Sequence, residues 1–137
     1  MRKSFVAAAL AALVIGVLAA PAGAQTVSKF SVITLTKSSH PSGGSIIVRS
    51  RLVEPGERNE VLGHGLAKFT PRGQRVRARI IFYFADGSLK AKGVFGPGDN
   101  KLAVVGGSGR WNGASGKVKL SNAGHGAERY SFTVVQG

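Results

Sequence analysis

The segment from Arg75 to Phe84 follows a period of two, and this pattern constrains the fold of the chain more than any other feature. Side chains point alternately to the two faces of a β-strand, so one face of such a segment is buried and the other faces solvent. Arg75, Arg77 and Arg79 share the second face. The buried face carries Val76, Ala78, Ile80, Phe82 and Phe84. The sequence therefore predicts a strand that covers an apolar core with a charged wall.

Shorter stretches of the same alternation recur along the chain, separated by turn residues such as Asp86-Gly87, and no stretch after residue 24 has a helical period. This arrangement is typical of an all-β sandwich or barrel. The predicted strands cover residues 27–37, 45–53, 61–69, 75–84, 88–95, 101–105, 117–121 and 129–135. Closing eight antiparallel strands into a ring removes both sheet edges. We therefore predict a closed eight-stranded antiparallel β-barrel, and a two-sheet sandwich is the structural alternative.

The first 24 residues are predicted to be a cleaved signal peptide. A basic start at Arg2 and Lys3 precedes an apolar run from Phe5 to Ala20, and a small-residue pattern ends at Ala24. This is the layout of a secretory signal, and the run is shorter than the ~20 residues that span a bilayer. We expect a single domain over residues 25–137, secreted or held in the periplasm or cell envelope. The chain has no cysteine, so no disulfide supports this domain.

The most distinctive local feature is a cluster of glycines between two apolar runs, in residues 102–120. Glycine accepts backbone conformations that other residues avoid, so Gly106, Gly107, Gly109 and Gly113 are predicted to form a sharp turn between strands. Together with Ile81-Phe82-Tyr83-Phe84, Asp86-Gly87 and the final Tyr130-Ser131-Phe132-Thr133-Val134 segment, this cluster resembles the dirigent and allene oxide cyclase barrel family. The resemblance covers residues 61–137 well and the first two strands by pattern alone.

The resemblance implies a barrel that binds a small apolar molecule in its interior, with or without steering its cyclisation or coupling. It implies no cofactor, an isomerase or cyclase if the protein is an enzyme, and a homotrimer as in plant members. The acids at positions 54, 57, 60, 86, 99 and 128 fall in predicted turns or strand ends, so no catalytic residue is assigned. The predicted cavity wall consists of Phe82, Phe84, Phe95, Trp111, Tyr130 and Phe132, and a core filled by these same side chains is the alternative.

Positive charge dominates the surface chemistry, with a formal net charge of +13, or +11 without Arg2 and Lys3. Cations repeat at every second position of several predicted strands, which places them on outward faces: Arg49, Arg51, Arg75, Arg77, Arg79, Lys90, Lys92, Lys117 and Lys119. The alternative function is therefore a non-enzymatic cationic envelope protein that binds acidic polymers. A simpler reading is that these charges keep a β-rich protein soluble. Few exposed aromatics and the predicted export disfavour nucleic acid.

Metal binding is not expected. His40, His64 and His125 are far apart in the sequence, and a zinc site needs three or four ligands.

Overall fold

The computed structural model describes residues 25–137, so the predicted signal peptide at residues 1–24 lies outside the described residues. Every regular element in this part is a strand. The strands are β1 (Thr26–Ser42), β2 (Ser45–Glu54), β3 (Glu57–Arg72), β4 (Arg75–Phe84), β5 (Gly87–Phe95), β6 (Lys101–Gly109), β7 (Ser115–Gly124) and β8 (Ala127–Gln136). Within these residues there is no helix that is long and apolar enough to cross a membrane.

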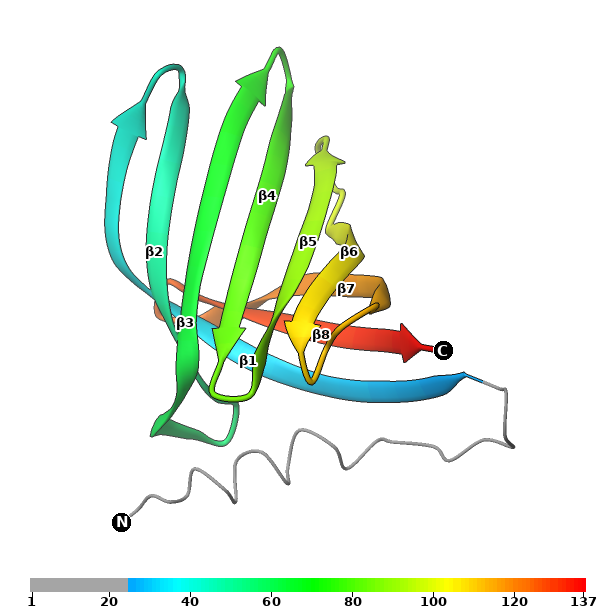
Figure 1. Cartoon of the computed structure of the whole chain (residues 1–137). Helices are drawn as coiled ribbons and strands as arrows, with labels where there is room; N and C mark the ends of the chain where they lie inside the picture. The colour runs from blue at the N-terminus through cyan, green and yellow to red at the C-terminus, as the bar shows by residue number, and fades with distance from the viewer. Residues whose placement is uncertain (1–24) are drawn as a thin grey trace.

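The eight strands form a closed ring in sequence order, each antiparallel to its neighbours (Figure 1). The first and last strands pair along nine positions, from Thr26 opposite Gln136 to Thr34 opposite Glu128. The prediction of eight antiparallel strands in a ring is confirmed, and the open sandwich is not what forms. A chain of alternating strands with short turns closes in this way because each strand needs a partner on both sides.

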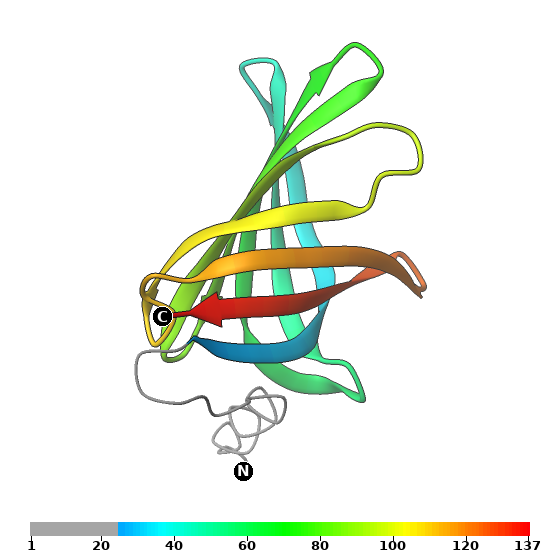
Figure 2. The same ribbon diagram turned by 90° about the vertical axis from the view of Figure 1, so that its right-hand side faces the viewer.

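β1 is bent, and its two parts pair with different strands. Its first part lies against β8, while its register with β2 shifts between Thr36 and Ser38 and continues to the hairpin at Ser42. A shift of this kind bends a strand and increases its twist. The β1–β2 and β3–β4 hairpins rise beyond the rest of the ring (Figure 2).

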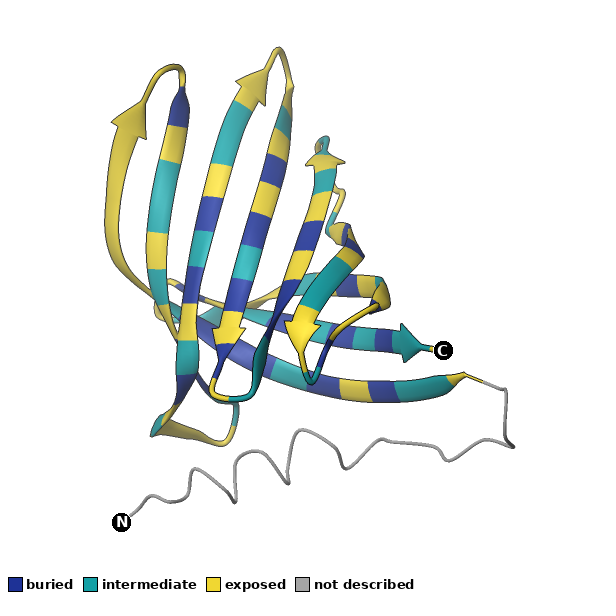
Figure 3. Ribbon diagram, in the orientation of Figure 1, coloured by how far each residue is buried: buried dark blue, intermediate teal, exposed yellow. Residues whose placement is uncertain are grey.

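The core fills the inside of the ring. Burial alternates along the strands, most regularly on β4, where the residues at 78, 80, 82 and 84 are buried and those at 75, 77 and 79 are exposed (Figure 3). This is the alternation that the sequence predicts for β4. A smaller apolar cluster lies apart from the main core and consists of Ile33, Val53 and Ala127 with Leu35 and Ala123 against them.

The glycine cluster differs from its prediction, because β6 continues through Gly109 and the turn occupies residues 110–113. Gly106 and Gly107 therefore lie within the strand. Gly107 is needed there because the backbone of its neighbours packs directly against it: an added Cβ would lie 2.4 Å from the Trp111 carbonyl oxygen and 2.6 Å from that of Ser88. Gly109 ends the strand with φ of 59°, and Gly113 ends the turn with φ of 75°.

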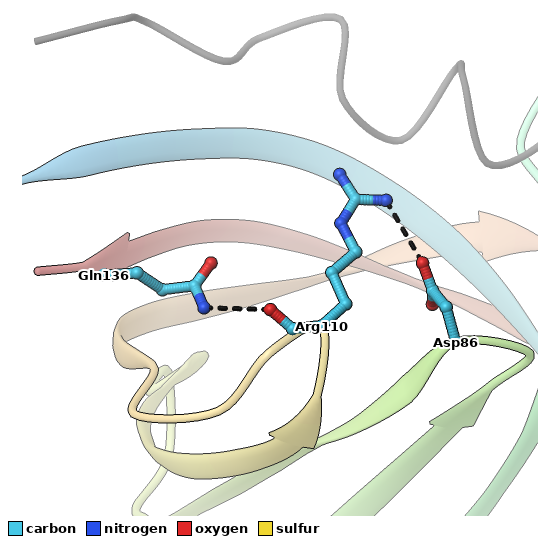
Figure 4. A network of polar contacts seen from close by, with 3 residues as sticks. All are labelled: Asp86, Arg110 and Gln136. Atoms are coloured by element: carbon cyan, nitrogen blue, oxygen red, sulfur yellow. Dashed lines mark hydrogen bonds and ion pairs between the residues drawn. The ribbon is translucent and has the colours of Figure 1, made fainter.

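Polar contacts tie this end of the ring together (Figure 4). Gln136 donates from Nε2 to the carbonyl oxygens of Arg110 (3.0 Å) and Asn112 (3.1 Å). The Arg110 guanidinium forms an ion pair with Asp86 at 3.3 Å, and both side chains are partly exposed. The last residues of β8, the β6–β7 turn and the β4–β5 turn are thus joined at one end of the barrel.

Candidate functional site

The end of the barrel that carries the β6–β7 turn is filled by aromatic side chains. Trp111 has no exposed surface, and its ring lies 5.3 Å from that of Phe30. Phe30 in turn stacks on Phe132 at 4.8 Å and meets the edge of Phe84 at 6.1 Å. These separations are those of packed aromatic pairs, which leave no room for a ligand between them. Within the described residues the Trp111 indole nitrogen has no hydrogen-bond partner.

The opposite end of the barrel is hollow. An inner hollow of about 250 Å³ lies within the ring, and an outer hollow of about 420 Å³ lies beside the β5–β6 connection. Phe69 and Glu128 line both, so the two hollows are adjacent, and we call them together the mouth cavity. The inner hollow is lined by Thr34, Thr36, Val48, Ser50, Ala67, Phe69, Ile80, Phe82, Gly126, Glu128 and Tyr130. The outer hollow is lined by Phe69, Val76, Phe95, Asp99, Asn100, Leu120, Ser121, Asn122 and Glu128.

The floor of the mouth cavity separates it from the aromatic core. Phe82 meets the ring of Tyr130 edge-on at 5.2 Å and that of Phe132 at 4.9 Å. Phe82 and Tyr130 line the inner hollow, whereas Phe132 lies below them in the core. The barrel is therefore filled at one end and open at the other, and the rings of Phe82 and Tyr130 form the boundary between the two parts.

Two polar side chains on β8 face this cavity, Glu128 and Tyr130. The Tyr130 hydroxyl donates to Glu128 Oε1 at 3.3 Å, and the Thr34 hydroxyl donates to the Glu128 carbonyl oxygen at 3.4 Å. Burial raises the pKa of the Tyr130 phenol far above its ordinary range, and the negative charge of Glu128 and the hydrogen bond to it raise this pKa further. Tyr130 is therefore a neutral hydrogen-bond donor, and Glu128 is an exposed acceptor at the junction of the two hollows.

The predicted cavity residues divide between the two ends of the barrel. Phe82, Phe95 and Tyr130 line the mouth cavity. Phe84, Trp111 and Phe132 line neither hollow and belong to the packed core. Both readings of this aromatic set, cavity wall and filled core, thus describe part of the barrel, and a role in ligand binding stays a prediction.

Sequence reasoning missed Glu128, which it placed at a strand end without a role. The missed signal is the alternation of β8 itself. Positions 130, 132 and 134 are buried, and Glu128 is the next member of the same series. A carboxylate in register with three buried residues indicates an acid at the rim of the interior rather than on the outer wall.

The predicted basic residues all lie on the outside. Arg49, Arg51, Arg75, Arg77, Arg79, Lys117 and Lys119 are exposed. In the described part of the chain Arg110–Asp86 is the one ion pair, so none of the seven is neutralised by an acidic side chain. The predicted binding of an acidic polymer would therefore use the outer wall and not the mouth cavity.

The histidines are dispersed over the ring. The His64 ring stacks on the Tyr83 ring with 4.8 Å between their centres. His64 on β3 is directly opposite Tyr83 on β4, and both side chains face outward. Among residues 25–137 no three His, Asp or Glu side chains lie close enough together to hold a metal ion.

Comparison with known proteins yields a structural likeness only. No family model and no curated protein matches the sequence. The fold is similar to that of a solved structure named pyocyanin demethylase, with a TM-score of 0.63 over 77% of this chain and 98% of that chain. The two sequences are 13% identical, so the likeness shows a shared architecture. The chain has the fold of a small β-barrel whose strands close around an interior.

Proposed function

We propose that this protein binds a small, largely apolar molecule in the mouth cavity, with Glu128 and Tyr130 recognising a polar group on it. The observation that carries the proposal is the presence of a hollow end and a filled end in one barrel: the aromatic floor at Phe82 closes a cavity that both apolar and polar side chains line. The outer hollow, at about 420 Å³, is within the range of about 300–1,000 Å³ in which proteins hold small ligands, and the inner hollow adds about 250 Å³ beside it. The similar barrel named for pyocyanin demethylation supports an interior that takes a small molecule.

The polar pair gives the proposed ligand its chemistry. The neutral Tyr130 hydroxyl donates its hydrogen bond to Oε1 of Glu128. The other carboxylate oxygen, Oε2, can therefore accept a hydrogen bond from a donor on the ligand. A hydrogen bond to a charged group contributes about 1.5–3 kcal/mol, which is enough to select a hydroxyl- or amine-bearing ligand over its hydrocarbon analogue. The preferred ligand is therefore an apolar body that carries one hydrogen-bond donor.

Dye binding tests the location of the site. N-Phenyl-1-naphthylamine is neutral, so the basic wall does not attract it, and its fluorescence rises in an apolar cavity. Thr36→Trp fills part of the inner hollow and is expected to weaken dye binding at least tenfold. Ser38→Trp is the matched control, because Ser38 is exposed and pairs with the outward Arg49. Absence of saturable dye binding, or equal loss in both variants, would refute the proposal.

Competition against the same dye tests the polar pair. The unchanged protein should prefer 1-naphthol to naphthalene by about tenfold or more, because only the former can donate to Glu128. Glu128→Leu should abolish this preference while leaving naphthalene affinity within about twofold. A preference that survives the substitution would show that the hydroxyl is recognised elsewhere.

The finer expectations from the dirigent and allene oxide cyclase resemblance belong to this proposal as well. They are export after removal of residues 1–24, a homotrimeric assembly, and a cavity that holds a flexible substrate in one folded conformation so that it cyclises or couples in one way. Holding reacting groups in place contributes up to about 7–11 kcal/mol without covalent chemistry. Analytical ultracentrifugation tests the assembly, and product analysis with and without Glu128→Leu tests the steering.

A further inference from the structure

The outer face of β3 to β6 carries basic residues that the proposed cavity does not use. The register places Lys68 directly opposite Arg79, and Arg79 directly opposite Lys92, so three cations lie side by side on three adjacent strands. Arg77 and Lys90 flank this row on the same outward face, and all five side chains are exposed. We call these five residues the basic face.

No acidic side chain pairs with the basic face. β4, β5 and β6 contain no acidic residue, the acids of β3 (Glu57 and Glu60) lie at its start, and the one ion pair among residues 25–137, Arg110–Asp86, lies at the end of the barrel. Like charges directly opposite each other destabilise a sheet. An anionic partner would reduce the electrostatic repulsion among these cations, so the binding of such a partner to the basic face is favourable.

The basic face also contains exposed apolar side chains and a hollow. Val94 and Val105 are 44% and 48% exposed, and Val105 has no partner on β5 because the register shifts between Lys90 and Ala91. A hollow of about 340 Å³ lies beside it, bounded by Arg79, Lys90 and Lys92 around Ile81 and Val105. Cations therefore surround an apolar floor on the outside of the barrel.

We propose that the basic face docks onto a bilayer that contains anionic lipids, with headgroup phosphates among Arg79, Lys90 and Lys92 and with the valines against the interfacial region. Positive charge mixed with exposed apolar side chains is the combination that holds a protein at an anionic membrane surface. A soluble polyanion would need the cations alone, and it would leave the exposed valines without a role. This docking uses a different surface from the mouth cavity and does not depend on ligand binding there.

Vesicle flotation tests the proposal. The closed ring and its core lie wholly within residues 25–137, so this portion is used, which keeps the apolar Phe5–Ala20 segment away from the lipid. We expect it to float with vesicles of phosphatidylglycerol and phosphatidylcholine and to remain behind with phosphatidylcholine alone. Failure to float with the anionic vesicles would overturn the proposal.

A matched pair of variants separates this face from general charge. Arg79→Gln with Lys92→Gln should lower partitioning by about thirtyfold, since each cation at an anionic surface contributes about fivefold. Arg49→Gln with Arg51→Gln removes two exposed cations of β2, on another part of the wall and away from the hollow at Val105, and it should lower partitioning by less than about threefold. Equal losses would show attraction by net charge without a docking face.

The valines separate a membrane from a polymer. Val94→Ser with Val105→Ser should lower vesicle binding severalfold and leave binding to inorganic polyphosphate unchanged. If vesicle binding is the same with and without the two valines and the protein also binds polyphosphate tightly, the face binds a soluble polyanion and the proposal is overturned. Because all substituted positions are exposed, circular dichroism is expected to match that of the unchanged protein. Thermal melting should show no loss of stability, and the variant with Arg79→Gln and Lys92→Gln should melt at the same or a higher temperature because a cross-strand repulsion is removed.

Discussion

Two neighbouring glycines of β6, Gly106 and Gly107, should respond in opposite ways to the same substitution. An alanine Cβ at position 107 would lie 2.4 Å from the Trp111 carbonyl oxygen and 2.6 Å from that of Ser88, and both atoms belong to the backbone. Each oxygen would have to move by about 1 Å to reach an ordinary contact, on β5 and in the β6–β7 turn at once. Overpacking of this kind costs about 1–3 kcal/mol for one contact, so with two we expect Gly107→Ala to lower the free energy of unfolding by about 3 kcal/mol or more.

Gly106→Ala is the control within the same strand. An added Cβ there meets nothing within 4 Å, and the backbone is not in a region that demands glycine. Alanine restricts the unfolded chain, so the free energy of unfolding should stay unchanged or rise by up to about 1 kcal/mol. Urea unfolding can be followed by the fluorescence of Trp111, the one tryptophan of the chain. A Gly107→Ala variant within about 1 kcal/mol of the unchanged protein, or equal effects at both positions, would refute the steric argument.

Three further substitutions test the core, the polar pair and the closed end. Phe132→Ala should cost about 3–5 kcal/mol in urea unfolding, because the ring is buried between two aromatic neighbours, and a loss below about 2 kcal/mol would contradict that packing. The raised pKa of Tyr130 favours its neutral form in the folded protein, so stability should be intact below about pH 10 and fall above it by up to about 1.4 kcal/mol per pH unit. Tyr130→Phe should lack this part of the alkaline loss in a pH series of unfolding curves, and identical slopes would count against the burial of the phenol. Arg110→Gln should cost about 1–2 kcal/mol, since it removes a partly exposed pairing with Asp86 and a guanidinium that lies 4.7 Å from the centre of the Trp111 ring, and a loss above about 3 kcal/mol would contradict this geometry.

The sequence predicts the parts of the fold that local alternation determines. β4 has the predicted bounds, and its even positions from Ala78 to Phe84 are buried as predicted, because a period of two has one solution when one face is apolar. The turn that follows β4 lies one residue earlier than the Asp86-Gly87 pattern predicts, at Ala85 and Asp86, and Gly87 is already the first residue of β5. The order of pairing follows from short connections, since neighbours in sequence become neighbours in the ring.

Features that depend on contacts between distant strands could not be predicted in the same way. The conformation of Gly107 depends on how closely Ser88 and Trp111 approach it, and a glycine-rich sequence is equally consistent with a turn. Glu128 looked like a turn residue because the strand begins beside it, and only the shared face with Tyr130 places it at the cavity. The division of the barrel into a filled and an open end depends on which side chains meet across the ring, as Phe30 and Phe132 do.

The pairing of β1 with β8 has a consequence for how the protein is made. Thr26 and Gln136 are at opposite ends of the described chain, so this pairing is unavailable while the ribosome is still synthesising the final strand. Until then β1 and β7 remain open edges that can pair with other chains. Contacts between residues so far apart in sequence also slow folding. Chaperones that hold the nascent polypeptide until its last strand emerges would therefore protect it from aggregation.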